Sequence, residues 1–222
     1  MSLLRVPPQT LRWLPGALLL CLAGCSGLHS NESPAQVYTL APPLPATAAA
    51  ATPVPGVSPP GATLKVLRPL CFPGLDGDGI VLTRGGQQLD YFAHSRWAAP
   101  LPELLASAAI DALRAAGQFR AVQSDAAPLD ADYLLQLEIR RFQADYHGED
   151  APTIHVQLVA TLGRRSDRSL ISSAVAEGAA PASANRMQNI SAAFETALGQ
   201  ALAQLVNQVQ PPTPAAQGLI RP

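Results

Sequence analysis

The thiol of Cys25 is the group in this sequence whose surroundings indicate chemistry most clearly. It follows Leu22-Ala23-Gly24, and small residues at this place are typical of a signal-peptide cleavage site. Cleavage after Gly24 would make Cys25 the first residue of the mature chain. A cysteine thiolate is a nucleophile that a lipid can alkylate. The pattern therefore predicts that Cys25 carries a lipid.

Residues 1–24 have the organisation of a secretory signal. Arg5 and Arg12 precede an apolar run, Leu14 to Ala23, which is shorter than the roughly 20 residues that a membrane-spanning helix needs. Together with Cys25, this segment resembles a bacterial lipobox signal. The resemblance implies removal of the signal peptide and acylation of the new N-terminus. The other interpretation is an ordinary secretory signal with a cysteine nearby by chance.

Membrane attachment and its location follow from the lipobox. Two or more acyl chains anchor a protein stably, since each buried CH₂ contributes about 0.8 kcal/mol. Ser26, and not an aspartate, follows Cys25. By resemblance to Gram-negative lipoproteins, this favours the inner leaflet of the outer membrane over the inner membrane.

Cys71 is the one thiol that remains after such processing. Cys21 lies in the signal, and Cys25 would be consumed by the lipid. A single leftover cysteine in an oxidising compartment cannot form an internal disulfide. We expect Cys71 to be buried rather than reactive.

The motif Asp76-Gly77-Asp78-Gly79 looks like the start of a calcium loop. An EF-hand loop needs a ligand at position 5, glycine at position 6 and a carboxylate at position 12. Ile80, Val81 and Gln87 stand at these positions. The motif is therefore interpreted as a turn between strands.

The histidines do not suggest a metal site either. They stand at positions 29, 94, 147 and 155, with no HxxH or HxxxH spacing. The sequence also lacks a G-x-S-x-G elbow and a glycine-rich phosphate loop. We therefore predict no metal, no cofactor and no enzymatic activity.

The charge balance excludes a typical nucleic-acid binder. Lys and Arg together number 15 against 16 Asp and Glu, so the formal net charge is −1. Nucleic-acid binding relies on a surplus of basic side chains that displace counterions.

The N-terminal part of the mature chain has the composition of a tether. From Pro42 to Ala62 it is rich in proline and alanine, carries no charge and has no hydrophobic period. We predict an acylated N-terminus and tether at 25–63, a folded domain at 64–210 and a flexible tail at 211–222. The alternative is a long insertion that joins two strands, because Val37 to Leu40 resembles a strand. That segment could also dock as an edge strand.

Two hydrophobic periods predict the elements of the domain. Period-two alternation from Tyr133 to Arg140 and from Ile154 to Leu162 indicates strands with one buried face. Spacings of three and four residues predict helices from Leu101 to Ala115 and from Met187 to Val209, the first ended by Gly117. Shorter strands are predicted at Leu64–Arg68, Gly79–Thr83, Leu89–Phe92, Phe119–Gln123 and Leu170–Ala176. This order indicates an α+β fold, a two-layer sandwich of a mostly antiparallel sheet with two helices packed on one face.

Arg96 and Trp97 stand just before the first predicted helix, and Trp97 is the only tryptophan outside the signal. We favour a packing role, in which Trp97 anchors the helix start on the sheet. The alternative is a partner contact through Arg96 and Trp97, because Trp and Arg are common in interface hot spots.

The order of these features resembles the ABC-type transport auxiliary lipoprotein component family (PqiC-like). The resemblance spans about Cys25 to Val209, and the whole order is more specific than any single motif. The features are the lipobox, Tyr38-Thr39-Leu40, Pro73-Gly74-Leu75-Asp76 running into Ile80-Val81, Tyr91 to Trp97, Gly117-Gln118-Phe119 with Val122, Asp132-Tyr133-Leu134-Leu135, and an alanine-rich terminal helix.

The resemblance implies a non-catalytic periplasmic subunit that is anchored to the outer membrane. In this family the subunit accompanies a transporter made of an ATPase, a permease and an MCE-domain protein, which is thought to move lipids across the envelope. The expected partners are the MCE-domain protein and the membrane, with a bound lipid as a further option. A lipoprotein module that binds or assembles an outer-membrane barrel is the alternative. A periplasmic enzyme is the third hypothesis, and it lacks a visible cluster of polar residues.

Overall fold

The structure is a computed structural model that describes residues 34–43, 61–85, 88–148 and 150–212. The predicted signal peptide, the lipid attachment at Cys25, most of the tether and the tail from residue 213 lie outside these described residues. None of the helices in the described part of the chain is long and apolar enough to span a membrane.

The elements follow the predicted order of strands, helix, strands and helix, which confirms the α+β class. The strands are β1 (Gln36–Tyr38), β2 (Thr63–Val66), β3 (Leu70–Cys71), β4 (Gly79–Arg84), β5 (Gln88–Trp97), β6 (Ala121–Ser124), β7 (Tyr133–Tyr146), β8 (Thr153–Arg164) and β9 (Leu170–Pro181). The helices are α2 (Leu101–Ala116) and α3 (Met187–Gln208). As the sequence predicts, Gly117 ends α2; the structure shows it in the left-handed conformation, with φ of 66°.

β7 is the centre of the sheet that these strands form. One of its edges pairs antiparallel with β8, which in turn pairs antiparallel with β9. The other edge pairs in parallel with β2, β3 and β4, beginning at Tyr133, Glu138 and Ala144 of β7. β5 pairs antiparallel with β4, while β1 and β6 add parallel partners to β5 and β2. The sheet is therefore mixed: its longest ladders are antiparallel, and the parallel ladders are short.

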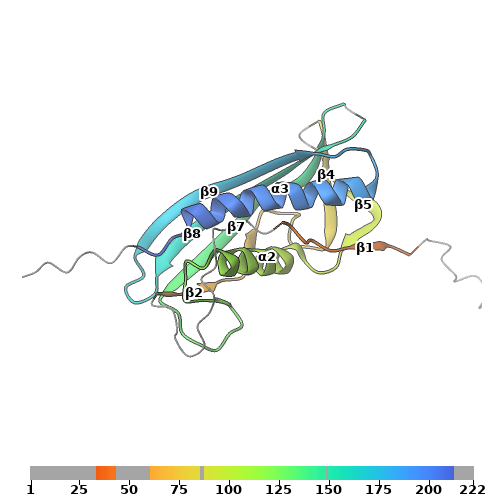
Figure 1. Cartoon of the computed structure of the whole chain (residues 1–222). Coiled ribbons are helices and arrows are strands. Elements are labelled where there is room, and N and C mark those ends of the chain that lie inside the picture. Colours follow the sequence, from red (N-terminus) through yellow and green to blue (C-terminus); the bar gives the residue numbers. More distant parts are fainter. Residues whose placement is uncertain (1–33, 44–60, 86–87, 149, 213–222) are drawn as a thin grey trace, which may run out of the picture. The chain divides into compact units, whose positions relative to one another are not determined.

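Both helices cover one face of the sheet, as predicted, and Figure 1 shows them in front of it. Most inward residues of β7 and β8 are fully buried; the residues that alternate with them are mostly half-buried, except that Arg140 and Arg141 are exposed and Asp145 is buried. Gly178 on β9 lets α3 lie close to the sheet, because a Cβ there would come within 1.9 Å of the Ala197 carbonyl oxygen.

Three glutamines of α3 close the free edge of β9. Gln204 donates to the Glu177 carbonyl and accepts from the Glu177 N–H, at 2.8 and 3.0 Å. Gln200 accepts from Ala179, and Gln208 donates to Val175. The spacing of four residues along α3 matches every second residue of the strand. These bonds occupy backbone groups that would otherwise pair with another strand.

β1 lies in the sheet at its opposite edge, where Gln36 to Tyr38 pair with Ser95 to Trp97. The residues between β1 and β2 therefore join two strands of one sheet. This agrees with the alternative interpretation of the proline- and alanine-rich stretch, a long insertion between two strands. Among the described residues, β1 pairs with β5 alone. The folded unit thus includes residues before position 64.

Candidate functional site

The segment that follows the predicted anchor enters the fold at β1. Cys25 itself lies outside the described residues, and residues 26–35 separate it from this strand. Val37 of β1 pairs with Arg96 of β5, and the Ala98 N–H donates to the Tyr38 carbonyl at 2.7 Å. Among the described strands, β1 is therefore the nearest in sequence to Cys25.

Arg96 lies on the surface beside this edge. Its side chain is 55% exposed, and its guanidinium is 3.6 Å from the Asp78 carboxylate, which is 48% exposed. Ion pairs between exposed groups stabilise a fold by only about 0–1 kcal/mol. The Arg96 guanidinium can therefore exchange this carboxylate for a partner at little cost.

Trp97 is buried, in contrast to Arg96. Its side chain is 2% exposed, and its ring packs edge-on against Phe194 of α3 and Phe142 of β7, at centroid distances of 5.3 and 5.9 Å. A partner cannot reach this ring while the domain is folded. The structure thus agrees with the packing role of Trp97, and the contact hypothesis remains for Arg96 alone.

The Asp76–Gly79 segment forms the turn before β4. The Asp78 carbonyl accepts from the Trp97 N–H at 2.7 Å, and the Gly77 carbonyl accepts from the Leu101 N–H at 2.9 Å. The turn therefore fixes the end of β5 and the start of α2. These backbone bonds account for the motif without a bound cation.

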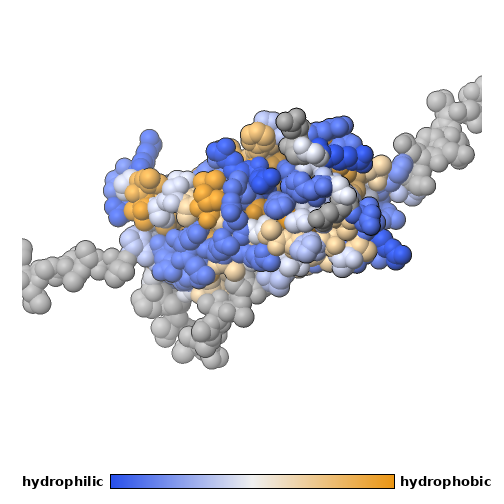
Figure 2. All heavy atoms as spheres, turned by 90° about the horizontal axis from the view of Figure 1, so that it is seen from above, coloured by the Kyte–Doolittle hydropathy of each residue, from blue (hydrophilic) through white to orange (hydrophobic). Residues whose placement is uncertain are grey.

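Exposed apolar side chains gather around this turn. Gly79 pairs with Arg96, and the ring of Tyr91 lies directly over Gly79. The Tyr91 hydroxyl donates to the Gly74 carbonyl at 3.1 Å, and Leu89 contacts Gly74. We call Phe72, Leu89, Tyr91 and Arg96 the turn surface; its three hydrophobic members are 53%, 41% and 47% exposed. On the face drawn in Figure 2, hydrophobic patches lie among hydrophilic side chains.

Cys71 is half-buried on β3 and is a free thiol. Burial, with a smaller contribution from the negative charge of Asp76, raises the pKa of this thiol to about 11, and Arg68 opposes the shift. A thiol with this pKa is protonated at neutral pH, and only the thiolate is a good nucleophile. The raised pKa thus gives a physical reason to expect that Cys71 is unreactive.

Alkylation of Cys71 should therefore be slow in the folded protein. At pH 8 we expect iodoacetamide to modify it about 100-fold more slowly than in the urea-unfolded chain, because two pKa units change the thiolate fraction about 100-fold. The rate should rise with pH until about pH 11. Mass spectrometry of the Cys71 peptide measures both rates. Equal rates in the two states, or a midpoint near pH 9, would contradict the shift.

The fold also brings together residues that the sequence left apart. Asp145 of β7, His147 just beyond it and His155 of β8 have potential ligand atoms that all lie within 4.8 Å of one another. The absence of HxxH spacing concealed this cluster, because the contact crosses two strands. The signal that could have found it is the alternation of the two long strands, once they are paired as a hairpin.

Comparison with known proteins gives the chain its family. The model of the ABC-type transport auxiliary lipoprotein component family matches residues 38–209. The crystal structure of protein XCC0632 from Xanthomonas campestris is similar, with 27% sequence identity, coverage of 78% of this chain and 93% of that chain, and a TM-score of 0.66. A solved structure of an uncharacterized protein has the same fold at 18% identity, covering 79% and 98% of the two chains with a TM-score of 0.57. Among curated proteins, no relative matches this chain.

The match begins in β1 and ends just after α3, so it covers the folded unit from its first strand to its last helix. This extent is more than half of the chain. The protein belongs to the family of ABC-type transport auxiliary lipoprotein components.

Proposed function

We propose that this protein is a non-catalytic subunit of an MCE-associated ABC transport system that moves lipids or other solutes between membranes. Acyl chains on Cys25 hold it at the inner leaflet of the outer membrane, and its folded unit binds the MCE-domain component. The observation that carries this proposal is the family match over residues 38–209, together with the lipobox before it. Members of this family are lipoproteins and are therefore attached to a membrane.

The predicted anchor, Cys25, lies close in sequence to β1, the strand that pairs with Arg96. From Cys25 to Gln36 the chain takes 36 − 25 = 11 steps, and a fully extended chain spans at most about 3.6 Å per residue. The β1–β5 edge therefore stays within about 40 Å of the acylated residue.

The turn surface is the proposed contact with the MCE-domain protein. It combines a tyrosine, a phenylalanine and an arginine, the residue types that interfaces use most. Arg96 gives up only a weak ion pair on binding. Among the described residues, β1 has no partner strand on its outer edge, so this edge offers backbone groups to a partner strand, whereas the edge of β9 is closed by glutamines.

An affinity pull-down from crosslinked, detergent-solubilised envelopes tests this function. We expect recovery of an MCE-domain protein together with its permease and ATPase. Arg96→Glu should reduce that recovery at least tenfold, because it reverses the charge at the contact. Arg114→Glu is the matched control, since the Arg114 side chain is equally exposed, also pairs with a carboxylate, that of Asp111, and lies in the last turn of α2, away from the turn surface. Recovery of an outer-membrane barrel without an ABC partner would instead support the assembly-module hypothesis, and equal loss in both variants would reject the turn surface.

A further inference from the structure

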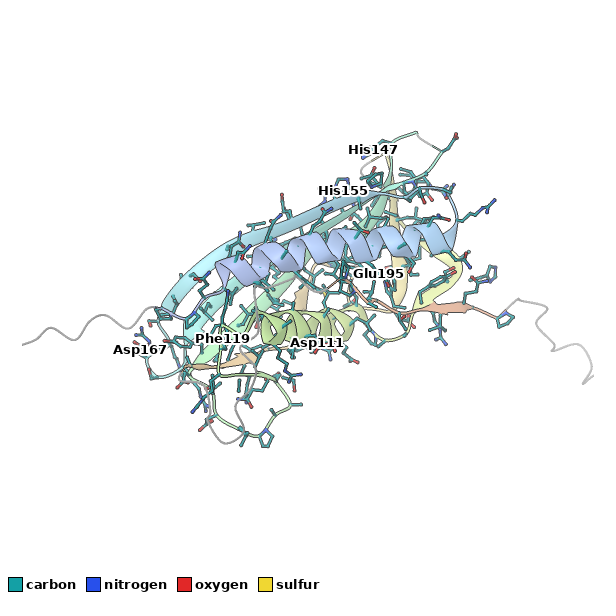
Figure 3. All side chains as sticks on the ribbon, in the orientation of Figure 1. Asp111, Phe119, His147, His155, Asp167 and Glu195 are labelled. Carbon is teal, nitrogen blue, oxygen red and sulfur yellow. The ribbon has the colours of Figure 1, made fainter. Side chains whose placement is uncertain are left out.

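Asp145, His147 and His155 converge at one end of the β7–β8 hairpin. His147 lies two residues after Asp145, in the bend that follows β7. His155 pairs with Gln143, and Asp145 pairs with Thr153, which makes His155 the diagonal neighbour of Asp145. Figure 3 shows His147 and His155 together at this end of the sheet, far from the labelled Asp167.

The carboxylate of Asp145 is held in one orientation by its neighbours. Its side chain is 3% exposed, and its Oδ1 accepts hydrogen bonds from the Thr83 hydroxyl and from Gln143 Nε2. Its Oδ2 points toward His155 Nε2 at 3.8 Å and toward Arg141 at 3.6 Å. No hydrogen bond to Oδ2 is formed among the described residues. One oxygen is thus fixed by a buried network, and the other is left for a further ligand.

We propose that Asp145, His147 and His155 bind one divalent transition-metal ion, with Zn²⁺ as the best match to these ligands. Two imidazoles and one carboxylate are donors that Zn²⁺ prefers, whereas Ca²⁺ and Mg²⁺ prefer oxygen alone. Ligand atoms about 2.0–2.2 Å from a tetrahedral ion lie about 3.4 Å from each other. From their present separation of at most 4.8 Å, the ligand atoms need to close by no more than about 1.4 Å. Water would occupy the fourth position.

The burial of the three residues suits this closure. Asp145 is buried and fixed, His155 is partly exposed, and His147 is exposed at the end of the strand. A rigid carboxylate with two adjustable imidazoles can adapt to an ion without disturbing the core. Thr83 and Gln143 would orient the carboxylate from outside, as residues around metal ligands commonly do.

Arg141 is the charged group that opposes the ion. Its guanidinium lies 3.6 Å from Oδ2, and its side chain is 49% exposed. A bound cation would repel this guanidinium and displace it into solvent. The metal and Arg141 therefore compete for the same carboxylate oxygen. Removing the positive charge of Arg141 should therefore increase the affinity for the metal. This increase distinguishes a metal site from a cluster that only forms ion pairs.

Titration of the untagged full chain in detergent with ZnCl₂, after EDTA treatment and dialysis, tests the site by calorimetry. We expect one Zn²⁺ per chain. His147→Ala and His155→Ala should each weaken binding at least tenfold, and Thr83→Val should weaken it about 10–100-fold. Arg141→Gln should bind Zn²⁺ more tightly. His94→Ala is the matched control, because His94 is exposed on β5 and is not part of the cluster.

The same variants show how the proposal would fail. Absence of saturable Zn²⁺ binding, or binding that survives both histidine substitutions, would overturn it. Circular dichroism checks that each variant is folded. If His155→Ala does not fold, His147→Ala decides, because this exposed side chain lies beyond the end of β7. Co²⁺ provides an independent readout, since its visible absorption reports tetrahedral nitrogen and oxygen ligands in the native chain and should be lost in the histidine variants.

Discussion

Trp97→Ala is expected to lower the free energy of unfolding by about 3–5 kcal/mol, the range for removing a large buried aromatic side chain. The ring is 2% exposed and packs edge-on against both Phe142 and Phe194, whose rings stack on each other. Its loss leaves a cavity where β5, β7 and α3 meet. Domains of this kind are stable by about 5–15 kcal/mol, so the change is a large fraction of the total. Urea unfolding followed by circular dichroism measures it, since the variant lacks the tryptophan needed for fluorescence.

Two further variants separate packing from partner contact. Trp97→Phe keeps an aromatic ring and should lose clearly less stability than Trp97→Ala. Arg96→Ala should change the free energy of unfolding by no more than about 0.5 kcal/mol, because its ion pair is exposed. A Trp97→Ala protein that unfolds like the wild type but no longer recovers the MCE component would reverse this interpretation and make Trp97 the contact.

The parts of the fold that the sequence predicts are those governed by local periodicity. The alternation from Tyr133 and from Ile154 marks β7 and β8, because one face of each strand is buried and the other is not. The helical spacing marks α2 and α3 for the same reason. β5 extends beyond the predicted Leu89–Phe92 as far as Trp97, since its exposed residues weaken the alternation.

The parts that the sequence could not predict depend on pairing between distant segments. β3 is two residues long, and only its hydrogen bonds to β7 define it. The parallel pairing of β1 with β5 joins segments about sixty residues apart, and no local pattern reports it. The cluster of Asp145, His147 and His155 has the same origin, because its geometry depends on the register of β7 and β8. For Trp97 the sequence allowed either a packing role or a partner contact, and only the tertiary packing of its ring distinguishes the two.

Cys25→Ala is expected to abolish lipid attachment, and with it the function in the envelope. The substitution removes the thiol that would be acylated, and cleavage at the lipobox is coupled to that acylation. Without the acyl chains, the hydrophobic free energy that holds the protein on the membrane is lost. The variant should therefore appear in the soluble periplasmic fraction or as an unprocessed precursor, and it should not complement a deletion. Membrane fractionation on a density gradient, labelling with an alkyne fatty acid and intact mass measure these outcomes.

Cys21→Ala and Cys71→Ala are the matched controls for this prediction. Cys21 lies four positions earlier in the apolar run, and Cys71 lies in the folded unit, so neither is the residue that a lipobox acylates. Both variants should remain in the outer-membrane fraction and incorporate the label. If Cys25→Ala fractionated normally with the outer membrane, the lipid at this position would not be the anchor. Because Cys25→Ala and Cys21→Ala both leave the folded unit unchanged and Cys71→Ala changes it, a defect confined to Cys25→Ala assigns the anchoring to Cys25.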